Sequence, residues 1–580
     1  MNAGIVLQNA FKTSTHDQDK AISPEETVAR FQDKLKGVDL DILAEVVRID
    51  NGRLGIPVYF SRCGQDAKAL TGTTKQMGKG ATPLQAKASA VMELAERFSF
   101  FSFCNDQRNF QVAPFEQMEG QGALSFDKIA RSVHDQSDDL PLARNIFKTI
   151  PMRWTKGFNL SRQKEVMVPF DWFYTINEFN GPSAGNCQEE ALLQGICEVI
   201  ERHVCAKVSH GQLSTSIILP DNVRNFEVKG MLEKYRTIGI EFVFNDFSLD
   251  TGIPTVSMIA YDPSTFPVLS EIVWTAGTTP DPEKALSRAM TEVAQLAGDF
   301  TSGFNYVASG LPKLNHVKEA DFLFKSDKTV TLKDLPDLAN DNFKVEIQNC
   351  LTALQKIHLE VICINTRHNQ LDIPAFYTII PGAHFRERAL GTSVGMFSAK
   401  LIMEKYPAPA ALKKLHTADQ QLPGKYYLQF YLGNAYLNLG DPETATAHLQ
   451  QALELNPPSQ EMVDIYSYLG VCHKDMGRYT EAVTILNKGL AIDTDRADIH
   501  NLMGFCHFKL RAYETAIGCF EKGLQLNPSS AIDYANIGVN YKALGERAKA
   551  IEYYTMALQI DPSVEFARTH LEELGAPFPN

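Results

Sequence analysis

Small residues recur every 34 positions in the C-terminal third of the chain, and this period constrains the fold more than any other feature of the sequence. The clearest markers are the glycines Gly470, Gly504 and Gly538. Further markers at this period, and an earlier copy, are Ala482, Ala516 and Ala550, Pro528 and Pro562, Leu432-Gly433 and Leu455-Asn456-Pro457. A fixed period of this length indicates a stack of similar units, each touching only its neighbours.

The period and pattern resemble the tetratricopeptide repeat, in which each unit is a helix, a turn and a second helix. The glycines, together with Gly433, match the small position of the first helix, where the two helices pack closely. Four units are expected over about residues 426–565, with a polar helix near Ser563 to Leu574 as a cap. The resemblance implies an all-α solenoid that binds a protein partner or peptide on its concave surface. The alternative is that the array only packs against its neighbouring domain or a second copy.

Length, charge and cysteine usage limit the class of protein. At 580 residues the chain is too long for one core, so roughly two to four domains are expected. The net charge of −13 and the pI of about 5.6 argue against general binding to nucleic acid or to an anionic membrane. Ten scattered cysteines without metal-ligand spacing are typical of reduced thiols. With no secretory signal over residues 1–20 and no apolar run of membrane-spanning length, we expect a cytoplasmic protein.

Strand-like and helical segments alternate over the first 400 residues, which predicts an α+β domain with mixed sheets and long helices. Strands are expected at Ile56–Phe60, Ile240–Phe244, Thr255–Ala260 and Leu359–Ile364, and helices near 83–103, 187–208, 281–301 and 344–357. The predicted organisation is an N-terminal extension at 1–40, this domain at 41–403, a hinge at 404–425 and the solenoid at 426–580.

Two of the predicted helices carry a pair of glutamates and an arginine in otherwise apolar turns. The runs are Glu93-Leu94-Ala95-Glu96-Arg97 and Glu198-Val199-Ile200-Glu201-Arg202. The charges of each run share one helix face, because they are three and four residues apart. Helices that are apolar on most sides are usually buried, and buried charges are costly unless other charges meet them. The alternative is an ordinary ion pair within each helix, worth about 0.3–0.5 kcal/mol on a surface.

Polar residues near these helices extend the pattern. Ser89 lies one turn before Glu93, and Gly78-Lys79-Gly80 precedes the first helix, where a lysine could contact phosphate or form an exposed turn. Asn186 and Glu190 lie at the start of the second helix, where Asn186 is also a candidate helix cap. A third helix carries Arg288, Glu292 and Gln295. Glutamates suit Mg²⁺ and arginines suit phosphate oxygens, so we predict one Mg-nucleotide site built from three helix faces.

In these motifs, the chain resembles the YcaO domain family, which binds ATP without a Walker motif. Its three motifs, in order, match Ser89, Glu93, Glu96 and Arg97; then Asn186, Glu190, Glu198, Glu201 and Arg202; then Arg288, Glu292 and Gln295. The run from Leu371-Asp372-Ile373-Pro374 to Ile380-Pro381-Gly382 resembles the closing strand and loop of the family. The resemblance covers roughly residues 40 to 400.

The resemblance implies a reaction class and roles for these residues. Enzymes of the family use ATP to phosphorylate a backbone-amide oxygen, and a side chain or sulfide then displaces it to give an azoline or a thioamide. The glutamates at 93, 96, 198, 201 and 292 are expected to hold Mg²⁺, with Glu96, Arg97, Glu201, Arg202 and Arg288 in catalysis. Lys79, Ser89, Asn186, Glu190 and Gln295 are expected to orient the nucleotide.

Two departures from the family keep other functions open. Azoline-forming members often end in Pro-x-Pro-x-Pro, whereas this chain has only Pro407-Ala408-Pro409 and Pro577-Phe578-Pro579. No substrate-binding domain of the cyclodehydratase type precedes the domain. One alternative is an ATP-binding accessory factor for methylthiolation of a ribosomal protein, with a sulfur-transfer or methylthiotransferase partner. Another is a non-catalytic repeat scaffold. A homodimer is expected from the habits of the family.

Overall fold

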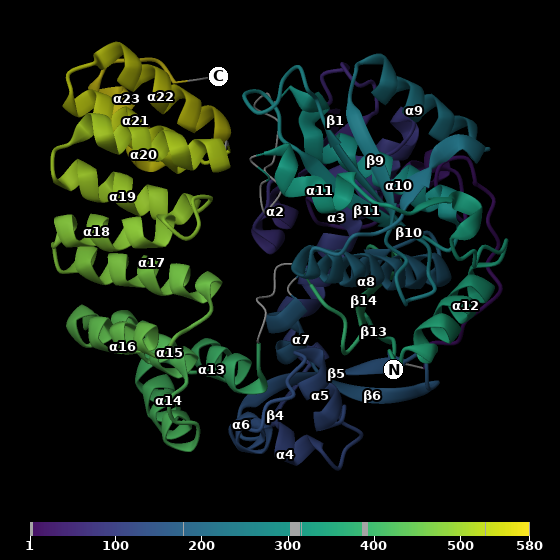
Figure 1. The fold of residues 1–580 in the computed structure, drawn as a ribbon, viewed down its shortest axis with the longest axis horizontal. Helices are drawn as coiled ribbons and strands as arrows, with labels where there is room; N and C mark the ends of the chain where they lie inside the picture. The colour runs from purple at the N-terminus through teal and green to yellow at the C-terminus, as the bar shows by residue number, and fades with distance from the viewer. Residues whose placement is uncertain are drawn as a thin grey trace. The chain divides into compact units, whose positions relative to one another are not determined.

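A computed structural model describes residues 4–177, 179–301, 314, 316–385, 392–527 and 529–578. The chain forms two compact units, one made of most of the residues up to Phe397 and one from Ser398 onward. The second unit also includes Pro141–Ile146. We call them the front unit and the repeat unit, and Figure 1 shows the strands in the first and stacked helices in the second. The predicted α+β domain followed by an all-α repeat array is confirmed.

Two sheets and the helix between them form the centre of the front unit. One sheet has the order β11-β10-β9-β8-β12, and the other has β4-β5-β13-β14-β7 with β6 paired to β5. The first contains β8 (Ile217–Leu219), β9 (Glu241–Asp246), β10 (Thr255–Tyr261), β11 (Val273–Thr278) and β12 (Thr329–Thr331). The second contains β4 (Gln111–Pro114), β5 (Pro151–Asn159), β6 (Lys164–Pro169), β7 (Pro182–Ala184), β13 (Ile362–Asn365) and β14 (Ala375–Ile379).

Helix α8 (Gln188–Gly211) lies between these two sheets, which explains why its sequence is apolar on most sides. Its residues share one core with Ile259 and Trp274 of one sheet and Phe376 of the other. Helix α12 (Phe343–Lys356) packs beside it. The charged residues of α8 are therefore placed in a water-poor interior, where they need charged partners.

The opposite face of the five-stranded sheet is covered by α9 (Phe226–Thr237) and α10 (Pro282–Ala297). Strand β10 alternates between the two sides, because Ile259 faces α8 while Met258 and Ala260 join the core of α9 and α10. Asp281 caps α10 by accepting hydrogen bonds from the backbone N–H groups of Glu283 and Lys284 at 2.7 and 3.2 Å.

A third, three-stranded sheet supports the first charged helix. It has the order β1-β2-β3, from β1 (Leu43–Arg48), β2 (Val58–Cys63) and β3 (Lys75–Lys79). Helix α3 (Pro83–Asn105) packs on β2 and β3, and α1 (Pro24–Lys36) packs on α3. A Cβ at Gly78 of β3 would lie 2.1 Å from the backbone nitrogen of Ala90, so only glycine allows α3 to approach the strand this closely.

Shorter helices complete the front unit. They are α2 (Gln65–Thr71), α4 (Phe115–Met118), α5 (Phe126–Ser132), α7 (Phe170–Asn177) and α11 (Asp321–Phe324). Most of α6 (Leu140–Phe147) is assigned to the repeat unit. Eight of the ten cysteines are buried, as expected for thiols that fill cores. Among the helices in the described ranges, none is both long and apolar enough to cross a membrane.

From Tyr426 onward, the described part of the repeat unit contains four helix pairs and a final helix, as predicted. The pairs are α15 (Tyr426–Asn438) with α16 (Pro442–Glu454), α17 (Ser459–Asp475) with α18 (Tyr479–Leu490), α19 (Ala497–Lys509) with α20 (Tyr513–Leu526), and α21 (Ala531–Ala543) with α22 (Arg547–Ile560). Helix α23 (Glu565–Glu573) packs on the last pair at the predicted cap. A Cβ at Gly504 would lie 2.7 Å from the Phe520 ring, which explains the small residue at this repeat position.

The connection between the two units is largely helical. Residues 404–425, predicted as a hinge, contain the end of α13 (Val394–Lys405) and the whole of α14 (Ala408–Gln421), which packs on α15. Pro407 is the residue before α14, so the prolines at 407 and 409 begin a helix. Pro528 and Pro579 lie outside the described residues.

Candidate nucleotide-binding site

Four helices, two strand ends and an N-terminal loop of the front unit border a single cavity of about 180 Å³. Its walls come from α1, α3, α10, the start of α8, the ends of β3 and β7, and residues 14–20. The predicted site residues that line it are Lys79, Ser89, Glu93, Glu96, Asn186, Glu190 and Arg288. Residues far apart in the sequence, chosen only for their type and spacing, are therefore brought to one place.

Ion pairs between elements connect further predicted residues to this cavity. Arg288 Nε lies 3.3 Å from Glu201 Oε2, which links α10 to α8. The backbone N–H of Thr278 also donates to Glu201 Oε2, at 3.1 Å. The ammonium group of Lys79 pairs with Glu292, which links β3 to α10. Arg288 and Glu292 thus bond to other elements, although their i, i+4 spacing would also suit an ion pair within α10.

The first helix behaves differently, because its arginine bonds within the helix. Arg97 lies 3.1 Å from Glu93 Oε1 and 3.5 Å from Glu96 Oε1, and it also donates to the backbone oxygen of Phe179 at 3.3 Å. Arg97 does not line the cavity. For α3 the alternative of an intrahelical ion pair is therefore correct, and Arg97 acts on its own glutamates.

The remaining predicted residues lie around the cavity without lining it. Glu198 of α8 is near enough to Glu96 and Arg97 to influence their pKa values, and Arg202 influences those of Glu198 and Lys79. Gln295 lies on α10, half-buried, beyond the residues that border the cavity. Glu198 and Arg202 of the second motif thus add charge near the cavity without lining it.

The site has more negative charge than its own cations neutralise. Burial raises the pKa of Glu96 well above its usual range, and the nearby Glu93 carboxylate raises it further. Burial also raises the pKa of Glu198, although Arg202 and Arg97 oppose this. Carboxylates whose charged forms are disfavoured in this way are stabilised by a divalent cation, and oxygen ligands are those that Mg²⁺ takes.

The same site holds cations suited to phosphate. Burial lowers the pKa of Lys79 to about 7, and the Arg288 guanidinium lowers it as well. Within the described ranges, no three His, Cys, Asp or Glu side chains are already grouped closely enough to hold a metal ion. The donor set thus fits a nucleotide phosphate with Mg²⁺, since a phosphate would bring its own oxygens to the metal.

Two local predictions were wrong. Lys79 is the last residue of β3, with its side chain mostly buried, and does not belong to an exposed turn. Asn186 does not cap α8; Cys187 does, with its sulfur accepting a hydrogen bond from the backbone N–H of Glu190 at 3.4 Å. The Asn186 amide instead donates to the Glu190 carboxylate at 3.2 Å, inside the cavity wall.

An N-terminal loop closes one side of the cavity, and sequence reasoning did not find it. Ser14, Asp17, Gln18 and Lys20 line the cavity, and Lys20 Nζ lies 3.5 Å from Glu190 Oε1. Buried Asp17 accepts hydrogen bonds from the backbone N–H of Ala81 at 2.9 Å and from the hydroxyl of Ser287.

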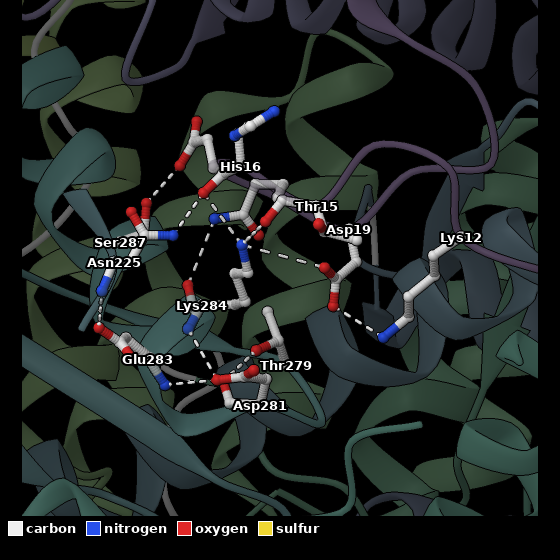
Figure 2. Close-up of polar contacts among 12 residues, drawn as sticks. Lys12, Thr15, His16, Asp19, Asn225, Thr279, Asp281, Glu283, Lys284 and Ser287 are labelled. Carbon is white, nitrogen blue, oxygen red and sulfur yellow. Dashed lines mark hydrogen bonds and ion pairs between the residues drawn. The ribbon is translucent and has the colours of Figure 1, made fainter. Parts of the chain in front are cut away.

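Polar contacts hold this loop against the start of α10. Figure 2 shows Lys284 reaching the backbone oxygens of Thr15 and His16, and Lys12 bonded to Asp19. Lys12 also bonds Glu346 of α12 at 2.6 Å. Lys284 and Glu346 are hundreds of residues away from the loop in sequence, so no local pattern could reveal that the extension belongs to the site.

Comparison with known proteins agrees with the motifs. A model of the YcaO cyclodehydratase, described as ATP- and Mg²⁺-binding, matches residues 77–384, more than half of the chain. Models of the tetratricopeptide repeat match residues 439–506, 497–530 and 534–564.

Individual relatives are distant. An uncharacterized protein of Methanothermobacter thermautotrophicus is 28% identical over 63% of this chain and 94% of its own length. The ribosomal protein S12 methylthiotransferase accessory factor YcaO of Escherichia coli is 26% identical over 49% of this chain, which spans only 50% of that protein. A heterocyclase solved in complex with substrate and cofactor shares the fold, with a TM-score of 0.53 and 19% identity over 66% of this chain and 55% of its own.

Proposed function

This chain belongs to the YcaO family, which is described as ATP- and Mg²⁺-binding, and we propose that it phosphorylates a backbone-amide oxygen of a peptide or protein. The observation that supports this most directly is the cavity where carboxylates of α3 and α8 meet Lys79 and Arg288. A site that gathers both metal-binding and phosphate-binding groups suits phosphoryl transfer.

In the proposed reaction, the amide oxygen attacks the γ-phosphorus of ATP and ADP leaves. A Cys, Ser or Thr side chain of the substrate, or sulfide, then adds to the amide carbon, and phosphate leaves with the former amide oxygen. The products are an azoline or a thioamide. Since the protein forms no covalent bond in this scheme, its residues contribute by positioning the reactants and neutralising charge.

The glutamates are the proposed metal ligands. Glu93 and Glu96 face the cavity, and Glu201, Glu198 and Glu292 lie behind it. Mg²⁺ would neutralise the phosphates and relieve the repulsion that raises the pKa of Glu96. Arg97, already bonded to Glu93 and Glu96, would set the orientation of these carboxylates.

The cations and amides are the proposed nucleotide contacts. Arg288 and Lys79 line the cavity and would bind phosphate oxygens, with Arg202 adding positive charge nearby. Ser89, Asn186 and Glu190 also line it and would orient the nucleotide. We retain Gln295 as a substrate-orienting residue, acting from α10.

The repeat unit is the proposed recruiting element for the substrate or for a sulfur-transfer protein. Arrays of this kind present extended surfaces to other proteins. A homodimer stays a prediction. A second function is favoured by the E. coli relative named as an accessory factor of a methylthiotransferase, similar over half its length. In that role the chain would bind ATP and a methylthiotransferase without changing a backbone amide itself.

The test uses the full chain with ATP, Mg²⁺, sulfide and a peptide that co-purifies with it. We expect the peptide to stimulate ADP release, and its mass to show loss of one water or exchange of one oxygen for sulfur. The Glu201→Ala variant should lose both effects, because Glu201 organises the site through Arg288 and Thr278. Peptide binding without ADP release or a mass change would overturn the proposal and favour the accessory role.

A further inference from the structure

Away from the nucleotide cavity, two adjoining cavities of about 560 and 830 Å³ form one groove in the front unit. They share Asp127, Arg131 and Leu359, so the groove is continuous. Its walls are α5, the β5–β6 turn, the α12–β13 connection and one face of α8. We call it the α5 groove. Each half has the size of a small-molecule site, and together they suit a longer ligand.

The α5 groove is separate from the nucleotide cavity, because the two lie on opposite faces of α8. Gln194 lines the nucleotide cavity, whereas His203 and Lys207 line the groove. His203 is nine residues after Gln194, which places it about 14 Å further along the helix and half a turn around it. One buried helix therefore serves two sites.

Five cationic side chains line the groove beside four acidic ones, although the whole chain carries a net charge of −13. Five lysines and arginines line it, namely Lys128, Arg131, Arg162, Lys164 and Lys207. Arg131 and Lys164 make no ion pair with any described residue. Arg131 is exposed on α5, and Lys164 is exposed at the start of β6.

Most of the acidic groups that line the groove already have partners. Asp250 pairs with Lys207 at 2.8 Å. Glu360 pairs with Arg162 at 2.5 Å and with Lys128. Buried Asp135 accepts hydrogen bonds from Ser137 and from the backbone N–H of Val394. The remaining acid, Asp127, is exposed at the rim. The groove therefore has a surplus of donors over acceptors.

Three imidazoles, those of His134, His203 and His384, line one end of the groove. The Nδ1 atom of His203 accepts a hydrogen bond from the backbone N–H of His384 at 3.0 Å, so the neutral ring carries its proton on Nε2. The His134 ring stacks on that of His384, with centroids 3.7 Å apart and planes 6° apart. His134 has a φ of 56°, an uncommon conformation for a residue with a side chain, and it places this ring in the groove.

We propose that the α5 groove binds an acidic stretch of polypeptide, which serves as a recognition segment of the substrate. The surplus of donors selects carboxylates, and the length of the groove selects an extended chain over a small anion. This inference rests on the proposed function, because it assumes a peptide or protein substrate. The four-pair repeat array would repel the same segment, since residues 426–580 hold 19 acidic against 11 basic residues.

The position of the groove also predicts spacing within the substrate. An extended chain rises about 3.3 Å per residue, so a separation of about 14 Å requires at least about four residues. The acidic stretch would therefore lie several residues from the amide that is modified. This arrangement separates recognition from chemistry, and it permits one recognition segment to serve different reacting residues.

The test measures fluorescence anisotropy of a labelled, glutamate-rich peptide with the full chain at low salt. We expect binding that weakens with salt, and a loss of about tenfold or more in the double variant Arg131→Glu with Lys164→Glu. The matched control is Lys229→Glu with Arg236→Glu, two exposed residues of α9 with the same change in charge. The control should bind within about twofold of the wild type.

Three results would overturn the inference: no binding by the wild type, equal loss in both double variants, or equal binding of a glutamine-rich peptide. Complete competition by inorganic phosphate at equal charge concentration would do so too, since it would identify a small-anion site. Mg-ATP binding is measured on the same proteins. If the wild type does not bind Mg-ATP, the proposed function is refuted but the peptide result stands. The two failures are therefore distinguishable.

Discussion

The two units of this chain are assembled from contacts of opposite range. In the repeat unit each helix packs on the next one along the chain, as α19 does on α20. In the front unit the site depends on pairs such as Lys79 with Glu292 and Glu201 with Arg288, which join distant segments. A local pattern therefore predicts the repeat unit directly, whereas the site can be predicted only through residues whose charge conflicts with their apolar surroundings.

The two units also differ in what their geometry costs. In the repeat unit, small residues let neighbouring helices approach closely, and the stability comes from the packing between them. The front unit places carboxylates and guanidinium groups beside α8, a helix enclosed by two sheets. Buried charges lower the free energy of unfolding because they lose their contact with water. The front unit therefore has lower stability in exchange for a site that binds a charged ligand.

The largest effect that sharpens this comparison is expected at a repeat glycine. Gly504→Ala would place a Cβ 2.7 Å from the buried Phe520 ring, so it should lower the free energy of unfolding by about 1–3 kcal/mol. Nucleotide binding by the front unit should not change. Urea unfolding followed by circular dichroism measures the first, and calorimetry with Mg-ATP measures the second.

The control for this variant lies in the same repeat. A Cβ at Gly518 of α20 would meet no atom within 4 Å, so Gly518→Ala should raise stability by up to about 1 kcal/mol through helix propensity. Opposite signs for the two substitutions support packing as the reason for the repeat glycines. Equal changes in the free energy of unfolding would show that the repeat glycines are not required for the close approach of α19 and α20.

A smaller effect is expected from acidity within the repeat unit. Burial raises the pKa of Glu461 on α17 to about 7, with the Asp464 carboxylate adding to it. Between about pH 4.5 and 7 the folded state then binds more protons than the unfolded state, so stability should fall as pH rises through this window. Glu461→Gln should reduce that slope and raise the melting temperature at pH 8 by about 2 °C.

Melting curves of the full chain at pH 5 and pH 8 check this expectation. Glu481→Gln, at an exposed site on α18, is the matched control and should leave the slope as in the wild type. The same pH slope in the wild type and in Glu461→Gln would show that burial does not raise the pKa of Glu461.

The sequence predicted the repeat array almost completely, and seven of the residues that line the nucleotide cavity. The 34-residue period located the helix pairs, and the Glu-x-x-Glu-Arg spacing located α3 and α8, because both patterns are local. It did not predict which partner each charge would meet, since Arg97 bonds within its helix while Arg288 bonds to α8. Those choices depend on how the sheets place the helices.

Other parts of the site had no local signal. The N-terminal loop contributes Lys20 and Asp17, but its polar sequence is that of an ordinary extension until Glu190 and Ser287 lie beside it. The sequence favours Asn186 over Cys187 as the cap of α8, because a thiol is a weak acceptor and asparagine is a better one on average. The α5 groove is assembled from separate segments between residues 125 and 384, so only the fold could reveal it.

The central claim is that charges from α3, α8 and α10 form one Mg-nucleotide site, and calorimetry with ATP in the presence and absence of Mg²⁺ tests it most directly. Wild type should bind ATP only with Mg²⁺, and Glu93→Ala and Glu201→Ala should each lose about tenfold or more in affinity. Glu233→Ala, exposed on α9, should bind as the wild type does. Unchanged binding in both site variants would contradict the account.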